Sequence, residues 1–166
     1  MVHESGGVTI TAFLVDHSPV EPALGYRIDY GGRSVTISGD TVHDENVILM
    51  ARDSDLLIHE ALNRDMVLLM AEAAKANGNN ALAKIFADIV DYHASPAEAA
   101  DVAESAGAGM LVLTHIVPPL PSPLLHAAFL GDARDHYSGR LIIGEDGQLI
   151  SLPANQGTIS VEQRLD

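Results

Sequence analysis

Short apolar runs that end in a histidine or an acidic residue recur along this chain, and they limit the folds that it can adopt. Residues 12–15 are followed by Asp16 and His17, and residues 111–114 are followed by His115. A β-branched run ends at Ser38 and is followed by Gly39 and Asp40. In a layered α/β fold, strand ends present side chains to a site rather than to the core. We therefore expect His17, Asp40 and His115 to meet at one edge of a sheet.

The pattern of apolar residues and turn residues predicts a mixed α/β layered sheet. We predict strands at residues 8–15, 24–30, 33–38, 55–60, 110–114, 140–143 and 148–152. We predict helices at residues 44–52, 64–77, 81–90, 95–106 and around 124–130. Gly31-Gly32 favours a hairpin between the second and third strands, and Glu145-Asp146-Gly147 favours a closing hairpin between the last two. Strands that alternate with helices in this way are typical of α/β layers.

Composition narrows the kind of protein further. The 166 residues suffice for one domain, and 47% hydrophobic residues with only 4% aromatics predict an aliphatic core. The chain has no cysteine, which excludes disulfides and thiolate zinc sites, so that any metal must be held by His, Asp or Glu. No apolar stretch reaches about 18 residues, and the first residues do not resemble a secretory signal. We expect a cytoplasmic protein that does not contact a membrane.

The chain is strongly acidic. Nine Lys and Arg residues stand against 23 Asp and Glu residues, which gives a net charge of −14. This charge argues against non-specific binding of nucleic acid through this segment. The acidic residues are dispersed along the chain, as on an ordinary solvated surface.

Two further residues at predicted element boundaries are candidates for chemistry. His93 precedes a helix start marked by Ser95, Pro96 and Glu98, and a positive helix end suits a neutral ligand or a proton acceptor. Glu60 ends a predicted strand and can orient a ligand, shuttle a proton or form an ion pair. Asp40 can instead cap the helix that follows it, and His115 can be a structural histidine. The remaining histidines in loops or on polar faces are expected to be solvated: His3, His43, His126 and His136.

Five stretches in this order resemble the metallo-β-lactamase superfamily, with the ribonuclease Z and arylsulfatase-like branch as the nearest. They are residues 24–28, 38–41, 55–61, 93–100 and 113–116, within a resemblance that covers residues 8–153. It implies an αββα sandwich with a two-metal site, most often zinc but also manganese or iron. His17 would bind one zinc, Asp40 would bridge both and His115 would bind the other. His93 matches the histidine thought to assist proton transfer to the leaving group, and Glu60 is assigned as a further catalytic residue.

The superfamily's His-x-His-x-Asp-His run, which supplies four further ligands, does not occur in the chain. We therefore expect residues 1–153 to be a partial domain, mainly the C-terminal half of the sandwich, followed by a polar, frayed tail at 154–166. We do not expect this chain alone to bind two metals tightly. Our first hypothesis is a metal-dependent hydrolase of ester or phosphodiester bonds, acting on small anionic or ester substrates or on RNA. The alternative is a non-catalytic half-domain that forms a homo-oligomer, or pairs with a missing N-terminal half, through its exposed sheet face.

Overall fold

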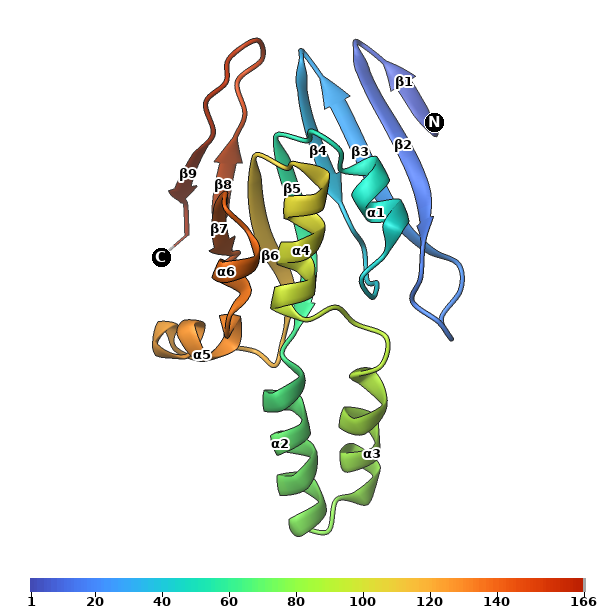
Figure 1. The fold of residues 1–166 in the computed structure, drawn as a ribbon, viewed down its shortest axis with the longest axis vertical. Helices are drawn as coiled ribbons and strands as arrows, with labels where there is room; N and C mark the ends of the chain where they lie inside the picture. The colour runs from blue at the N-terminus through green and yellow to red at the C-terminus, as the bar shows by residue number, and fades with distance from the viewer. Residues whose placement is uncertain (166) are drawn as a thin grey trace.

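The structure, a computed structural model, describes residues 1–165 and is built around one seven-stranded sheet (Figure 1). The strands lie side by side in chain order: β1 (His3–Ser5), β2 (Val8–Val15), β3 (Ala23–Tyr30), β4 (Arg33–Ile37), β5 (Leu56–Leu62), β6 (Met110–Val117) and β7 (Arg140–Ile143). Neighbours from β1 to β4 are antiparallel, and neighbours from β4 to β7 are parallel. The predicted mixed α/β sheet is confirmed, although the short strand β1 was not predicted.

Local signals account for the elements that the sequence predicted correctly. Gly31 and Gly32 both have positive φ, at 55° and 74°, as a tight turn between β3 and β4 requires. The helix α4 (Pro96–Ala106) begins with a complete capping box, in which Ser95 and Glu98 satisfy each other's backbone N–H groups. It ends at Gly107 in the left-handed conformation.

Helices cover one face of the sheet. They are α1 (Glu45–Met50), α4, α5 (His126–Leu130), which follows a 3₁₀ turn at Pro123–Leu125, and α6 (Ala133–His136). Their apolar side chains form the main core with β5 and β6, in which Val47, Leu57, Leu111, Leu113 and Phe129 are completely buried. These aliphatic and alanine-rich contacts agree with the low aromatic content of the chain.

A two-stranded ribbon of β8 (Gln148–Ser151) and β9 (Ser160–Gln163) packs on the opposite face. The predicted closing hairpin was therefore wrong, because β7 pairs with β6 and β8 pairs with β9. Ile150 and Val161 pack against the buried face of β5 and β6, and a pattern of alternation does not specify which strand is the partner.

The tail is not frayed where β9 forms, which corrects that expectation. The Arg33 side chain, which is 7% exposed, donates hydrogen bonds to the carbonyl oxygens of Gln156 and Thr158, and it pairs with Asp55 at 3.0 Å. These contacts hold residues 156–158 against the sheet.

Two helices, α2 (Arg64–Ala76) and α3 (Asn80–Ile89), form a hairpin that projects away from the sheet (Figure 1). They correspond to the two predicted helical segments. In residues 1–165, no helix is both long enough and apolar enough to span a bilayer.

Candidate metal centre

The structure brings together all five residues predicted to form a site. His17 and Asp40 follow β2 and β4, Glu60 and His115 lie in β5 and β6, and His93 lies in the loop before α4. The His93 ring centroid is 4.9 Å from that of His17 and 5.4 Å from that of His115, on which it stacks. His115 Nε2 lies 3.9 Å from Asp40 Oδ2. Residues that lie up to 98 positions apart in the sequence, from His17 to His115, thus meet at one place.

Glu60 is a buried carboxylate, 1% exposed, whose Oε1 accepts three hydrogen bonds. The donors are His93 Nδ1 at 2.8 Å, the Thr41 N–H at 3.1 Å and the Ala94 N–H at 3.2 Å. Because a carboxylate accepts, the proton lies on His93 Nδ1, and Nε2 is left free toward the other rings. Of the three roles left open for Glu60, its contacts favour that of orienting His93.

His17 is also held through Nδ1, but by a backbone carbonyl oxygen instead of a carboxylate. Its ring is 8% exposed, and Nδ1 lies 2.8 Å from the carbonyl oxygen of Tyr92. A carbonyl oxygen can only accept, so Nδ1 carries the proton and Nε2 keeps its lone pair. A histidine with one nitrogen fixed by a backbone carbonyl is the usual arrangement of a metal-binding imidazole.

His115 is presented by a β-bulge that the sequence did not reveal. In the pairing of β5 with β6, Glu60 is opposite Thr114 and Ala61 is opposite Ile116, so His115 is the extra residue. Its φ is +46°, in the left-handed region that a residue with a Cβ rarely adopts. The strand also does not end at Thr114, as predicted, but continues to Val117.

The donor atoms are suited to a divalent metal. Ligand atoms of Glu60, His93 and His115 lie within 4.8 Å of one another. This group shares only His115 with the expected set of His17, Asp40 and His115. Glu60 Oε1 already accepts three hydrogen bonds, whereas Glu60 Oε2 is buried without a hydrogen-bond partner among residues 1–165. The 3.9 Å between Asp40 Oδ2 and His115 Nε2 is too long for a hydrogen bond. Two zinc bonds of about 2.1 Å can span that separation, and imidazole with carboxylate is a donor set that zinc, manganese or iron accepts.

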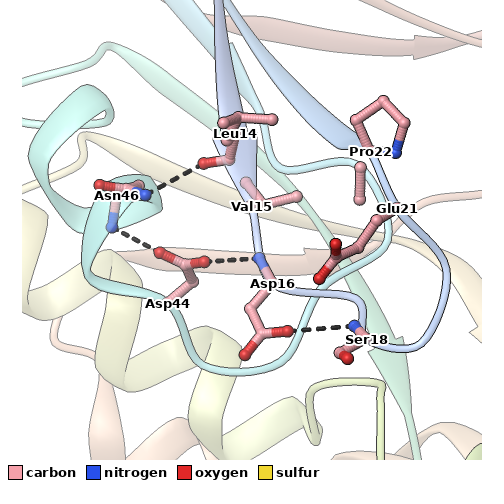
Figure 2. A pocket seen from close by; sticks show the side chains of 9 residues that line it. Leu14, Val15, Asp16, Ser18, Glu21, Pro22, Asp44 and Asn46 are labelled. Atoms are coloured by element: carbon pink, nitrogen blue, oxygen red, sulfur yellow. Dashed lines mark hydrogen bonds between the residues drawn. The ribbon is translucent and has the colours of Figure 1, made fainter.

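Two acidic cavities lie close to the centre in the chain: one is lined by the neighbours of His17 and the other by His115. One, of about 780 Å³, begins beside His17 and is lined by Asp16, Glu21 and Asp44. Figure 2 shows that Asp44 accepts hydrogen bonds from the N–H groups of Asp16 and Asn46, while Glu21 stays outside this network. The other cavity, of about 430 Å³, extends from His115.

The second cavity is lined by a histidine that we expected to be solvated. His126, at the start of α5, lines it with His115, Glu145 and Asp146. Only the long-range packing of α5 reveals this position. Neither cavity is lined by a lysine or an arginine.

The chain is similar to a known family and to curated ribonuclease Z sequences. Residues 1–116 match a family described as "Beta-lactamase superfamily domain". The chain is 36% identical over 140 residues to a ribonuclease Z of Mycobacterium tuberculosis (strain H37Rv), covering 84% of this chain and 47% of that protein. It is 33% identical over 140 residues to a ribonuclease Z of Mycobacterium sp. (strain KMS), covering 84% of this chain and 45% of that one. The chain thus spans about half the length of the curated relatives it matches.

Solved structures show the same fold. The metallo-beta-lactamase fold protein YhfI from Bacillus subtilis aligns with a TM-score of 0.62 at 25% identity, covering 96% of this chain and 52% of that one. The short form of human tRNase Z aligns with a TM-score of 0.57 at 23% identity, covering 92% and 46%. The predicted metallo-β-lactamase-type fold is therefore confirmed.

Proposed function

Because the chain belongs to the beta-lactamase superfamily domain family, we propose that it supplies part of the active site of a metal-dependent hydrolase similar to ribonuclease Z. The observation that carries this proposal is the convergence of His17, Asp40, Glu60, His93 and His115 from separate segments. In particular, a buried carboxylate fixes one histidine of the group at 2.8 Å. Such an arrangement is costly to bury unless its members have defined partners.

We assign His17 and His115 to hold one divalent metal each and Asp40 to bridge them. When bound, such a metal polarises a phosphoryl or carbonyl oxygen and lowers the pKa of water. We favour zinc, with manganese or iron as alternatives.

His93 is assigned as the acid that protonates the leaving group. Glu60 accepts from Nδ1, so Nε2 is the nitrogen that faces the reacting atoms. The Glu60 carboxylate orients the ring and faces the positive charge of the imidazolium. Thr41 and Ala94 hold that carboxylate through their backbone N–H groups.

The substrate is an ester or phosphodiester. The ribonuclease Z relatives support an RNA phosphodiester. The net charge of −14 and the two acidic cavities instead favour a small substrate, because they repel a polyanion. We therefore propose phosphodiester hydrolysis and let the comparison of a small diester with an RNA decide the substrate class.

The first experiment measures zinc affinity by competition with a chelating dye. Replacing His17, Asp40 or His115 by alanine should weaken binding at least tenfold, whereas His3→Gln, in the exposed strand β1, should leave it unchanged. Alanine variants that bind zinc as tightly as the wild-type chain, or a His3→Gln variant as weak as the alanine variants, would refute the assignment.

The second experiment separates proton transfer from metal binding. His93→Gln should lower the cleavage of an RNA phosphodiester by about 10²–10⁴-fold, since an alkoxide leaving group needs a proton. It should lower the cleavage of bis-p-nitrophenyl phosphate far less, because p-nitrophenolate leaves without one. Equal losses on the two substrates would contradict the role of His93.

A second candidate function rests on an exposed apolar face. On the side of the sheet away from the helices, Leu14, Tyr26 and Tyr30 are 61%, 38% and 53% exposed. The β8–β9 ribbon covers β5 and β6 but not this part. A non-catalytic half-domain would form a homo-oligomer through this face.

Light scattering coupled to size exclusion tests this candidate. The wild-type chain should be an oligomer, and Leu14→Lys combined with Tyr26→Lys should make it a monomer. Leu124→Lys, at the exposed 3₁₀ turn, serves as the control and should not. A monomeric wild-type chain would exclude the candidate.

A further inference from the structure

His59 is a fully buried histidine that the proposed chemistry does not use. It lies in β5 between Leu57 and Ala61, which pack in the core beneath the helices. Burial lowers the pKa of His59, which favours the neutral imidazole with a single N–H. Because Nδ1 lies 2.8 Å from the Glu60 carbonyl oxygen, which can only accept, that proton is on Nδ1.

The carbonyl that His59 contacts stands at the bulge. The register between β5 and β6 shifts between Glu60 and Ala61, and the extra residue opposite this step is His115. A left-handed φ of +46° at His115 persists only if the surrounding backbone is held in place. The bulge therefore sets the direction of the Glu60 and His115 side chains together.

We propose that His59 is a positioning residue, whose Nδ1–H bond to the Glu60 carbonyl oxygen holds the bulged backbone and, through it, Glu60 and His115. The inference rests on the proposed function only in taking these two side chains as parts of the reactive centre. His59 itself does not touch the substrate or the metal.

The chemistry of the side chain argues against a role in packing alone. His59 Nε2 is buried and has no hydrogen-bond partner among residues 1–165. An unpaired polar atom in the core costs stability, so a leucine of similar size would fill the same space at less cost. What histidine adds at this position, and leucine lacks, is the donor at Nδ1.

Two substitutions isolate that donor. His59→Leu removes it and keeps most of the volume. His59→Asn keeps a donor as many bonds from the Cα as Nδ1. Leu57→Ala is the control, because it leaves a cavity on the same face of the same strand without touching the Glu60 carbonyl.

The readouts are the ¹⁵N resonances of the His93 and His115 rings in metal-free protein, and the affinity for zinc. His59→Leu should shift both sets of resonances and weaken zinc binding about tenfold or more. His59→Asn should stay within about threefold of wild type, as a residue that restores the lost bond should. Leu57→Ala should lose stability and leave both readouts unchanged. The inference is overturned if His59→Leu leaves them unchanged too, or if His59→Asn is as deficient as His59→Leu.

A measurement on the wild-type protein keeps the inference testable if the variants do not fold. Long-range ¹H–¹⁵N correlation spectra should show His59 protonated on Nδ1, with a slowly exchanging proton. Protonation on Nε2 would overturn the inference. Alanine variants of His17, Asp40 and His115 that bind zinc as tightly as the wild-type chain would refute the proposed function, yet the ring resonances and the tautomer would still decide the role of His59.

Discussion

Glu60→Ala removes one acceptor atom that three donors share, and its cost can be worked out from the structure. The N–H groups of Thr41 and Ala94 and His93 Nδ1 all end on Oε1, and all three residues are at most 6% exposed. A buried donor left without a partner costs about 1–3 kcal/mol, so three donors cost at least about 3 kcal/mol. Water that enters the vacated space and the relief of carboxylate desolvation keep the loss near this lower bound.

Glu60→Gln separates the charge from the hydrogen bonds. Its Oε1 can still accept from the donors, but bonds to a neutral acceptor are about half as strong as those to a carboxylate. We expect a loss of about 1 kcal/mol. Urea unfolding of metal-free protein at 25 °C, extrapolated linearly to water with the same m value for all variants, measures the loss of unfolding free energy in Glu60→Ala and Glu60→Gln.

Glu104→Ala is the matched control, because the Glu104 carboxylate also accepts hydrogen bonds, in this case from the N–H and O–H groups of the exposed Ser138. Water replaces these bonds, so this variant should stay close to wild type. A loss below about 1 kcal/mol for Glu60→Ala, or equal losses for alanine and glutamine at position 60, would refute the reasoning.

Three other perturbations test separate parts of the structure. His115→Gly should be about 1 kcal/mol more stable than His115→Ala, because only alanine keeps a Cβ at the left-handed φ of +46°; equal urea midpoints would argue against the bulge. Arg33→Met should lower the free energy of unfolding by about 2 kcal/mol, because Asp55 loses its ion pair. It should also speed amide exchange in β9, because the hydrogen bond to the Thr158 carbonyl is lost, and unchanged exchange would contradict this role of Arg33. The hydrogen bond from His136 to Asp101 raises the pKa of His136. The contact therefore stabilises the fold fully below about pH 6.5, the ordinary pKa of histidine, and its contribution disappears as the pH rises through the raised pKa. Asp101→Asn should therefore make the urea midpoint depend less on pH between pH 6 and 8. An unaltered pH dependence of the midpoint would exclude this linkage.

Features set by neighbouring residues could be predicted from the sequence. The capping box at Ser95 and Glu98 and the turn at Gly31-Gly32 lie within a few residues of each other, so their chemistry is visible in the chain. Features set by distant pairing could not be predicted. Alternating apolar residues at 148–152 are compatible with either β7 or β9 as the partner, and burial against β5 and β6 decides between them.

The candidate site shows the same division. Strand ends and the family resemblance singled out the residues that meet, because each stands at a local boundary in the sequence. Glu60 could not be placed on His93 without the fold, since 33 residues separate them. No residue in β6 marks the bulge at His115, because its register depends on the pairing of β6 with β5.

The change from antiparallel to parallel pairing at β4 has a consequence for the order in which the molecule folds. The strands up to β4 are joined by short connections. Pairing β4 with β5 closes a longer loop that includes α1, and pairing β5 with β6 closes one that includes α2, α3 and α4. Pairing across such long loops is slow.

His17 belongs to the first part and Glu60 and His115 to the second, with Asp40 directly after the strand where they join. The centre is therefore complete only when folding is nearly finished. A divalent ion that binds there stabilises the finished fold by mass action and leaves the early steps unchanged. Zinc should accordingly slow unfolding and have little effect on the rate of folding.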